Sequence, residues 1–227
     1  MLFLFLVLIA CFIYLWHKGH YTYRLGQRLG IKIGTPPPDQ EVIALSSWKS
    51  SIAQLNISTD VVMFGDSLTR WGNFQKFFPD VRIINLGYSG DTLKGMIERV
   101  DMVKSVRAQK IFAQGGINGF INNGIIGTFE DYKELLALLQ KENKHSKIFV
   151  QSMLPVGFDK SISKKIAKFN IKLFELCEEL GIVYIDLFSI YSDESGNLPS
   201  EISNDGIHIK DYQKWFEAIK CYIQEEL

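Results

Sequence analysis

Residues 60–70 read DVVMFGDSLTR, an apolar run that ends at Gly65 and leads into a serine at position 67. Residues 61–64 are all apolar, which is typical of a strand buried on both faces. The Gly-Asp-Ser that follows predicts a sharp turn into a helix, with the Ser67 hydroxyl at the tip of the turn. A strand followed at once by a helix indicates a βα unit of a parallel sheet.

Four more short apolar runs have the same character. They span residues 81–86, 110–113, 147–153 and 182–187. Segments with apolar residues at three- and four-residue spacing alternate with these runs and predict amphipathic helices. They span residues 92–106, 128–142, 161–180 and 211–227. This order predicts an α/β fold with a doubly wound, five-stranded parallel sheet, and functional side chains beyond the carboxyl ends of its strands.

The chain has 227 residues, 25 Lys+Arg and 25 Asp+Glu, which gives a formal net charge of zero. This length holds one sizeable core, and the balanced charge argues against nucleic-acid binding. Three cysteines, at positions 11, 177 and 221, show neither a metal-binding spacing nor a disulfide framework. We expect Cys177 and Cys221 to be buried reduced thiols, with a bridge between them as the alternative.

The first 16 residues, MLFLFLVLIACFIYLW, carry no charge and end in aromatic residues suited to a membrane interface. As a helix they measure about 24 Å, which is short against a hydrocarbon core of about 30 Å. No basic residue precedes them, so an uncleaved anchor is favoured over a cleaved signal peptide. Residues 8–11 (LIAC) also resemble a lipobox, which would make Cys11 a lipidated N-terminus.

The segment after the predicted anchor is basic and then rich in proline. Lysine or arginine stands at positions 18, 24, 28 and 32. The positive-inside rule puts this flank in the cytoplasm. We expect a membrane anchor over residues 1–16, and a juxtamembrane segment and linker with a short helix, at about 41–55, over residues 17–57. A globular domain over residues 58–227 completes the chain.

Ser67 has two interpretations, a helix cap or a nucleophile, and an alcohol needs a base to become nucleophilic. His17 and His20 flank the apolar segment, and His145 lies in a polar turn. His208 alone lies in a loop before the last helix, which makes it the candidate base.

Asp205 stands three residues before His208, in the sequence NDGIH. With Gly206 allowing a tight turn, the Asp205 carboxylate can reach the near ring nitrogen of His208, fix its tautomer and stabilise its protonated form. The alternative is an ordinary Asp-Gly turn in which Asp205 caps the helix and His208 is incidental.

Two loops rich in glycine and asparagine follow predicted strands, at residues 85–91 (NLGYSGD) and 115–119 (GGING). Glycine N–H groups and asparagine amides are uncharged donors that stabilise the oxyanion of acyl transfer. Ordinary turn chemistry accounts for either loop taken alone.

Four pieces in this order resemble the blocks of the SGNH subgroup of GDSL esterases and lipases. They are GDS at 65–67, NLGYSG at 85–90, GIN at 116–118 and DGIH at 205–208. The resemblance runs from about Asp60 to the C-terminus. It implies a flavodoxin-like three-layer α/β/α sandwich and ester hydrolysis through a Ser-His-Asp triad, without metal or cofactor.

The resemblance also implies a role for each matching residue. Ser67 is the nucleophile, His208 the general base and acid, and Asp205 its orienting partner. The oxyanion hole consists of the Ser67 and Gly90 N–H groups and the Asn118 side-chain amide. One block departs from the usual GxND, because Gly119 replaces the aspartate. We expect altered support of the loop rather than loss of activity.

The expected substrate is a small-molecule or lipid ester, since the chain is similar to lysophospholipase/thioesterase and platelet-activating-factor acetylhydrolase-like members. A carbohydrate O-acetylesterase or an acyltransferase would use the same site. A non-catalytic, membrane-tethered binding protein on this fold is the alternative from another class. With the predicted anchor, the resemblance implies single-pass attachment to a bacterial inner membrane, with the side and the oligomeric state left open.

Ser89 is expected to be a structural loop residue, because no GxSxG elbow surrounds it.

Overall fold

The computed structural model describes residues 47–52 and 57–225. The predicted anchor at residues 1–16, Cys11 and most of the segment 17–57 lie outside the described residues. Among those that are described, no helix is both long enough and apolar enough to cross a membrane. A short helix occupies residues 47–52, inside the stretch for which the sequence predicts one.

Five parallel strands form one sheet in the order β2-β1-β3-β4-β5, which confirms the predicted α/β fold. The strands are β1 (Thr59–Gly65), β2 (Ile83–Gly87), β3 (Ala108–Gln114), β4 (Lys147–Gln151) and β5 (Val183–Ile185). The sheet starts with β1, adds β2 on one side and then β3 on the other, so the winding reverses at β1. Ligands of such sheets bind beyond the carboxyl ends of the strands at this reversal.

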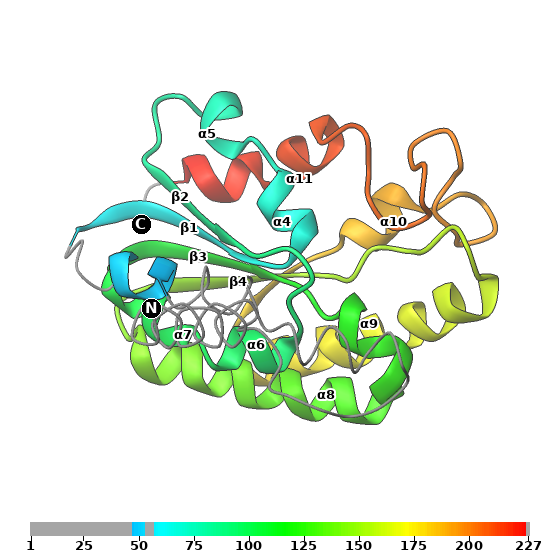
Figure 1. The fold of residues 1–227 in the computed structure, drawn as a ribbon, viewed down its shortest axis with the longest axis horizontal. Coiled ribbons are helices and arrows are strands. Elements are labelled where there is room, and N and C mark those ends of the chain that lie inside the picture. The colour runs from blue at the N-terminus through cyan, green and yellow to red at the C-terminus, as the bar shows by residue number, and fades with distance from the viewer. Residues whose placement is uncertain (1–46, 53–56, 226–227) are drawn as a thin grey trace, which may run out of the picture. The chain divides into compact units, whose positions relative to one another are not determined.

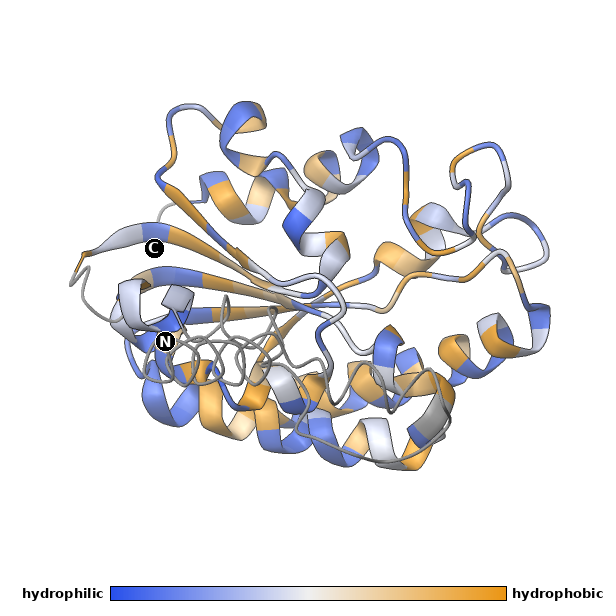
Figure 2. Cartoon of the chain, in the orientation of Figure 1, coloured by the Kyte–Doolittle hydropathy of each residue, from blue (hydrophilic) through white to orange (hydrophobic). Residues whose placement is uncertain are grey.

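Helices cover both faces of the sheet and make three layers (Figure 1). One layer contains α4 (Ser67–Trp71), α5 (Phe74–Phe77), α10 (Leu187–Tyr191) and α11 (Gln213–Gln224). The other contains α6 (Leu93–Ile97), α7 (Val100–Ser105), α8 (Ile117–Glu142) and α9 (Lys160–Leu180). Hydrophobic residues predominate in the strands and on the sides of the helices that face the sheet, and hydrophilic residues on the outer sides (Figure 2).

The core beneath α11 shows how the pattern specifies the packing. Trp215, Phe216, Ile219 and Ile223 form one buried stripe of this helix, as its periodicity predicts. They pack in one cluster with β1 residues such as Met63. The last helix is therefore fixed to the same strand that leads into Ser67.

Several predicted boundaries are wrong, among them that of the strand predicted over 147–153, which ends at Gln151. The helix predicted from residue 128 begins at Ile117, and α8 consists of two helical segments that meet at a kink at Gly124, where φ is 62° and ψ is −166°. The strand predicted over 182–187 ends at Ile185, because Asp186 caps α10 by accepting the Ser189 N–H at 3.1 Å.

Cys177 and Cys221 are both free thiols. Cys177, on α9, is buried as expected, whereas Cys221, on α11, is exposed. The expectation of two buried thiols is wrong for Cys221 because this residue lies two positions after Ile219, away from the buried stripe of its helix.

Candidate active site

Ser67 is the first residue of α4 and follows the carboxyl end of β1 by two positions. The helix cap is Asp66, whose Oδ1 accepts the Leu68 N–H at 3.0 Å, so the Ser67 hydroxyl is not needed for capping. Gly65 is required by close approach, since a Cβ there would lie 2.1 Å from the Gln114 carbonyl oxygen and 2.2 Å from Thr69 Oγ1. The turn is thus built around a serine whose oxygen is available.

The loop before α11 brings His208 to this serine, 141 residues away in the chain. Ser67 Oγ lies 2.9 Å from His208 Nε2, and His208 Nδ1 lies 2.6 Å from Asp205 Oδ2. The hydrogen bond from His208, followed by the backbone N–H groups of His208 and Ile207, holds the pKa of Asp205 well below its usual range. An ionised carboxylate only accepts, so Nδ1 carries the proton and Nε2 faces the Ser67 hydroxyl as an acceptor.

A tight turn gives Asp205 its reach. Asp205 Oδ1 accepts the N–H groups of Ile207 at 2.9 Å and His208 at 2.8 Å, so the carboxylate is held by its own loop. Gly206 has φ +74°, and a Cβ at this position would lie 2.9 Å from the Phe158 backbone nitrogen. Both the left-handed angle and the contact favour glycine, as the sequence predicts.

The other two loops also meet at this end of the sheet. Gly90 is exposed in the loop after β2, and Asn118 lies in the first turn of α8. Asn118 Nδ2 donates to the Asp91 carbonyl at 2.7 Å, which ties the start of α8 to the Gly90 loop. Gly90 and Asn118, the two predicted oxyanion donors outside the serine, therefore lie on two segments that are directly linked.

Arg99 links the same parts from beneath, and sequence reasoning missed it. Its side chain is fully buried, and Nε donates to Asp91 Oδ2 at 2.6 Å. The other two nitrogens donate to the Leu86 carbonyl at 2.7 Å and the Gly65 carbonyl at 2.8 Å. One guanidinium thus joins the ends of β1 and β2 to the loop that carries Gly90.

Burial works against the charges of this pair. It raises the pKa of Asp91, although Arg99 opposes the rise. Burial likewise lowers the pKa of Arg99, with Asp91 opposing. A buried ion pair is by itself weak evidence for stability, whereas the three hydrogen bonds of Arg99 fix the backbone that they join.

The inward turn of Arg99 also explains why the helix predicted over 92–106 is two helices. Arg99 has φ −126° and ψ 20°, outside the helical range, and separates α6 from α7. A signal was present in the sequence, because Arg99 falls three residues after Met96 and four before Val103, on the apolar face of the predicted helix.

The Gly119 departure leaves room beside Asn118. A Cβ at position 119 would lie 3.4 Å from Asn123 Nδ2 and 4.0 Å from the Thr92 Cβ. A hollow of about 190 Å³ lies here, lined mostly by polar residues that include Thr128 and Asp131. A longer side chain at position 119 would extend toward Asn123 and fill part of this hollow.

Asp66 has a second property besides capping. Burial, the largest influence, raises the pKa of Asp66 to about 7, opposed by the Leu68 N–H and assisted by the charge of Asp91. Its Oδ2 is buried and finds no hydrogen-bond partner among the described residues. The carboxyl of the residue before Ser67 therefore titrates close to neutral pH.

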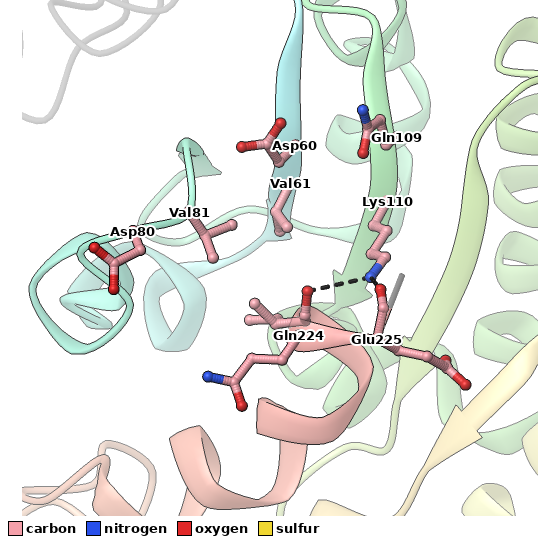
Figure 3. Close-up of a pocket in the computed structure, with 9 residues that line it drawn as sticks. Asp60, Val61, Asp80, Val81, Gln109, Lys110, Gln224 and Glu225 are labelled. Atoms are coloured by element: carbon pink, nitrogen blue, oxygen red, sulfur yellow. Dashed lines mark hydrogen bonds between the residues drawn. The ribbon is translucent and has the colours of Figure 1, made fainter. Parts of the chain in front are cut away.

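A larger hollow, of about 700 Å³, lies at the opposite end of the strands (Figure 3). Lys110 of β3 points there toward the last turn of α11, where its Nζ donates to the carbonyls of Tyr222 at 2.9 Å and Ile223 at 3.1 Å. This lysine caps a helix, and neither Ser67 nor His208 lines the hollow. In the part of the chain that the structure describes, no cluster of three or more His, Cys, Asp or Glu side chains fits a metal ion.

Comparison with solved structures shows the same fold in bacterial proteins. A GDSL-like lipase of Bacteroides thetaiotaomicron aligns with a TM-score of 0.69 and 20% identity over 82% of this chain and 98% of its own. A candidate acylhydrolase of Bacteroides fragilis aligns with a TM-score of 0.69 and 22% identity over the same shares of the two chains, 82% and 98%. A comparison with curated proteins found no match.

The model of one protein family matches residues 63–212, most of the chain. This range contains β1 from Met63 onward, the turn at Ser67 and the loop that carries His208. The chain belongs to the GDSL-like lipase/acylhydrolase family.

Proposed function

We propose that Ser67, His208 and Asp205 are the catalytic triad of an ester hydrolase that works through an acyl-enzyme. Membership of the family supports hydrolysis of a small-molecule ester. The observation that carries the proposal is the continuous pair of contacts, 2.9 Å from Ser67 Oγ to His208 Nε2 and 2.6 Å from His208 Nδ1 to Asp205 Oδ2.

In the first half of the cycle, His208 Nε2 takes the Ser67 proton while Oγ bonds to the ester carbonyl carbon. The imidazolium is stabilised by Asp205, whose lowered pKa keeps it ionised. The tetrahedral intermediate then expels the alcohol, which receives the proton from Nε2. In the second half, Nε2 takes a proton from water while the water oxygen bonds to the acyl carbon. The second tetrahedral intermediate then breaks its bond to Ser67 Oγ, which receives the proton from Nε2, and the acid leaves.

The negative oxygen of each intermediate needs donors, and we assign the N–H groups of Ser67 and Gly90 and the Asn118 amide. One Asn118 N–H is held by the Asp91 carbonyl, which fixes the amide, and an amide has a second N–H to offer. Donors fixed in advance stabilise an oxyanion because they need not reorient during the reaction.

We propose a lipid or other acyl ester as substrate, reached from a membrane to which residues 1–16 anchor the domain. An exposed apolar side chain supports an apolar substrate: Phe158, beside the Asp205 loop, is 49% exposed. The polar hollow beside Asn118 favours a second candidate, an O-acetylesterase acting on a hydroxyl-rich substrate.

The test follows hydrolysis of p-nitrophenyl esters from acetate to long acyl chains by the full-length protein. We expect turnover by the wild type and a loss of at least roughly 1,000-fold in Ser67→Ala, because this variant lacks the hydroxyl that contacts His208 Nε2. Ser105→Ala, which removes a hydroxyl bonded only within α7, is the matched control. A preference for acetate over long chains favours the O-acetylesterase. No hydrolysis of any ester by the folded wild type would contradict the proposal.

A further inference from the structure

The catalytic imidazole proposed above has a third neighbour besides Ser67 and Asp205. The ring centroid of Trp71 lies 4.1 Å from that of His208, and the two planes are inclined by 32°. Trp71 is the last residue of α4, and Ser67 is the first. Residues four apart lie on the same side of a helix, so one turn of α4 places both the serine and the indole against His208.

Three groups thus define the position of the His208 ring. Asp205 bonds its Nδ1, Ser67 bonds its Nε2, and the Trp71 indole lies across its face. The His208 side chain is 23% exposed, and Asp205 is more open to water, at 52%. The indole therefore covers part of a ring that is otherwise held only through its edge.

The charged groups around this ring are few. Among the residues that the structure describes, Asp205 is the ionised side chain that bonds the ring. Arg70 on α4 is exposed, Lys210 Nζ donates to the Glu201 carbonyl at 3.1 Å, and Asp211 Oδ1 accepts the Gln213 N–H at 2.9 Å. Besides Asp205, Trp71 is therefore in a position to influence the charge of the His208 ring.

We infer that Trp71 is a positioning residue that stabilises the protonated form of His208 through the face of its indole. The face of an aromatic ring carries negative electrostatic potential and attracts a cation within about 6 Å of its centroid, with tryptophan the strongest of the side chains. His208 gains a positive charge each time it takes the Ser67 proton. The indole then favours the charged ring over the neutral one and keeps Nε2 directed at Ser67.

The inference rests on the proposed function, and its first test does not need turnover. The ring signals of the histidines are followed by NMR across pH in the full-length wild type, with His208→Ala to assign the signal. We expect Trp71→Leu to lower the titration midpoint of His208 by about 0.5 pH unit or more, and Trp71→Phe to lower it by less. An unchanged midpoint would overturn the inference, and so would a raised one, since the indole would then act by excluding water.

Kinetics supplies the second test. Removing the indole in Trp71→Leu should lower kcat by roughly 3- to 30-fold with little change in KM, and move the acid limb of the pH profile to lower pH. Trp71→Phe should recover part of the loss, because a phenyl ring retains an aromatic face. A higher KM with unchanged kcat would show that Trp71 binds substrate instead.

The matched control is Phe174→Leu, which removes an aromatic ring from α9. Phe174 is 44% exposed, against 53% for Trp71, and its ring contacts that of Tyr184. This substitution should change neither the titration midpoint of His208 nor the kinetic constants. Absence of ester hydrolysis in the wild type would count against the proposed function, whereas the NMR midpoint decides the role of Trp71 in either case.

Discussion

At the scale of single residues, Asn118 is the side chain whose contribution is easiest to isolate. It lies in the first turn of α8, and its amide is held by the Asp91 carbonyl at 2.7 Å. Asn118→Ala should lower kcat by roughly 100- to 1,000-fold with a much smaller change in KM, because the donor acts on charge that develops in the transition state. Steady-state kinetics on a p-nitrophenyl ester measures both constants, and a change confined to KM would argue against an oxyanion donor.

Asp66 leads to a prediction about stability. Its pKa is about 7 in the folded chain, against roughly 3.9 for an unperturbed aspartate. The folded state therefore binds more protons between these two pH values, and this group stabilises the fold less as the pH rises through that range. Asp66→Asn removes the ionisation, so its stability relative to the wild type should rise by up to about 4 kcal/mol between pH 4 and pH 8.

Urea unfolding of the two proteins at several pH values measures this difference. The absolute stabilities are less informative than the way they diverge, because asparagine also changes the hydrogen bond to the Leu68 N–H. Two curves that run parallel from pH 4 to pH 8 would show that Asp66 does not titrate in this range.

The candidate triad was predictable because each member carries a local signal. Ser67 stands in a strand-to-helix turn, and Asp205 and His208 share one short loop. The contacts of Arg99 were not predictable, because the Gly65 and Leu86 carbonyls to which it donates belong to backbone that carries no distinguishing side chain. The meeting of Trp71 with His208 depends in the same way on the position of the whole loop before α11.

At the scale of elements, Arg99 joins β1, β2 and the Gly90 loop, and its removal should be costly. Arg99→Met leaves the Asp91 carboxylate buried without its partner, which should lower the free energy of unfolding by roughly 3–5 kcal/mol. The same substitution in an exposed ion pair, Arg82→Met opposite Asp60, is the matched control and should cost much less.

Urea unfolding of the wild type and both variants measures the two losses in free energy of unfolding. Adding Asp91→Asn to Arg99→Met should recover part of the loss, because the second change removes the unpaired charge. Equal losses for Arg99→Met and Arg82→Met would show that the buried pair has no special structural role.

The elements themselves followed the sequence wherever periodicity was strong. The stripe of α11 and the four-residue apolar run that becomes β1 were both predicted. The start of α8 was missed because its first turns contain Gly119 and Gly127, residues of low helix propensity, and a kink at Gly124. The break between α6 and α7 was missed because it is caused by Arg99, whose side chain donates to carbonyls at the ends of β1 and β2.

At the scale of the whole molecule, the topology explains why distant blocks form one site. Parallel strands bring their carboxyl ends to one edge of the sheet, so strand direction alone places the turns after β1, β2 and β3 together. The loop that carries His208 arrives from 141 residues away, held by α11 packing on the same face of the sheet as α4. Pattern and order predict the first arrangement, whereas the second depends on packing that no local signal encodes.

The central claim, that Ser67 is the nucleophile, has a direct chemical test. The full-length chain is treated with a fluorophosphonate, which bonds covalently to an activated serine, and the modified residue is identified by peptide mass spectrometry. We predict a single adduct on Ser67 and strongly slowed labelling in His208→Ala, since the base must take the proton. Labelling of Ser89, which is exposed in the neighbouring loop, or ester hydrolysis that continues after Ser67 is fully modified, would contradict the account.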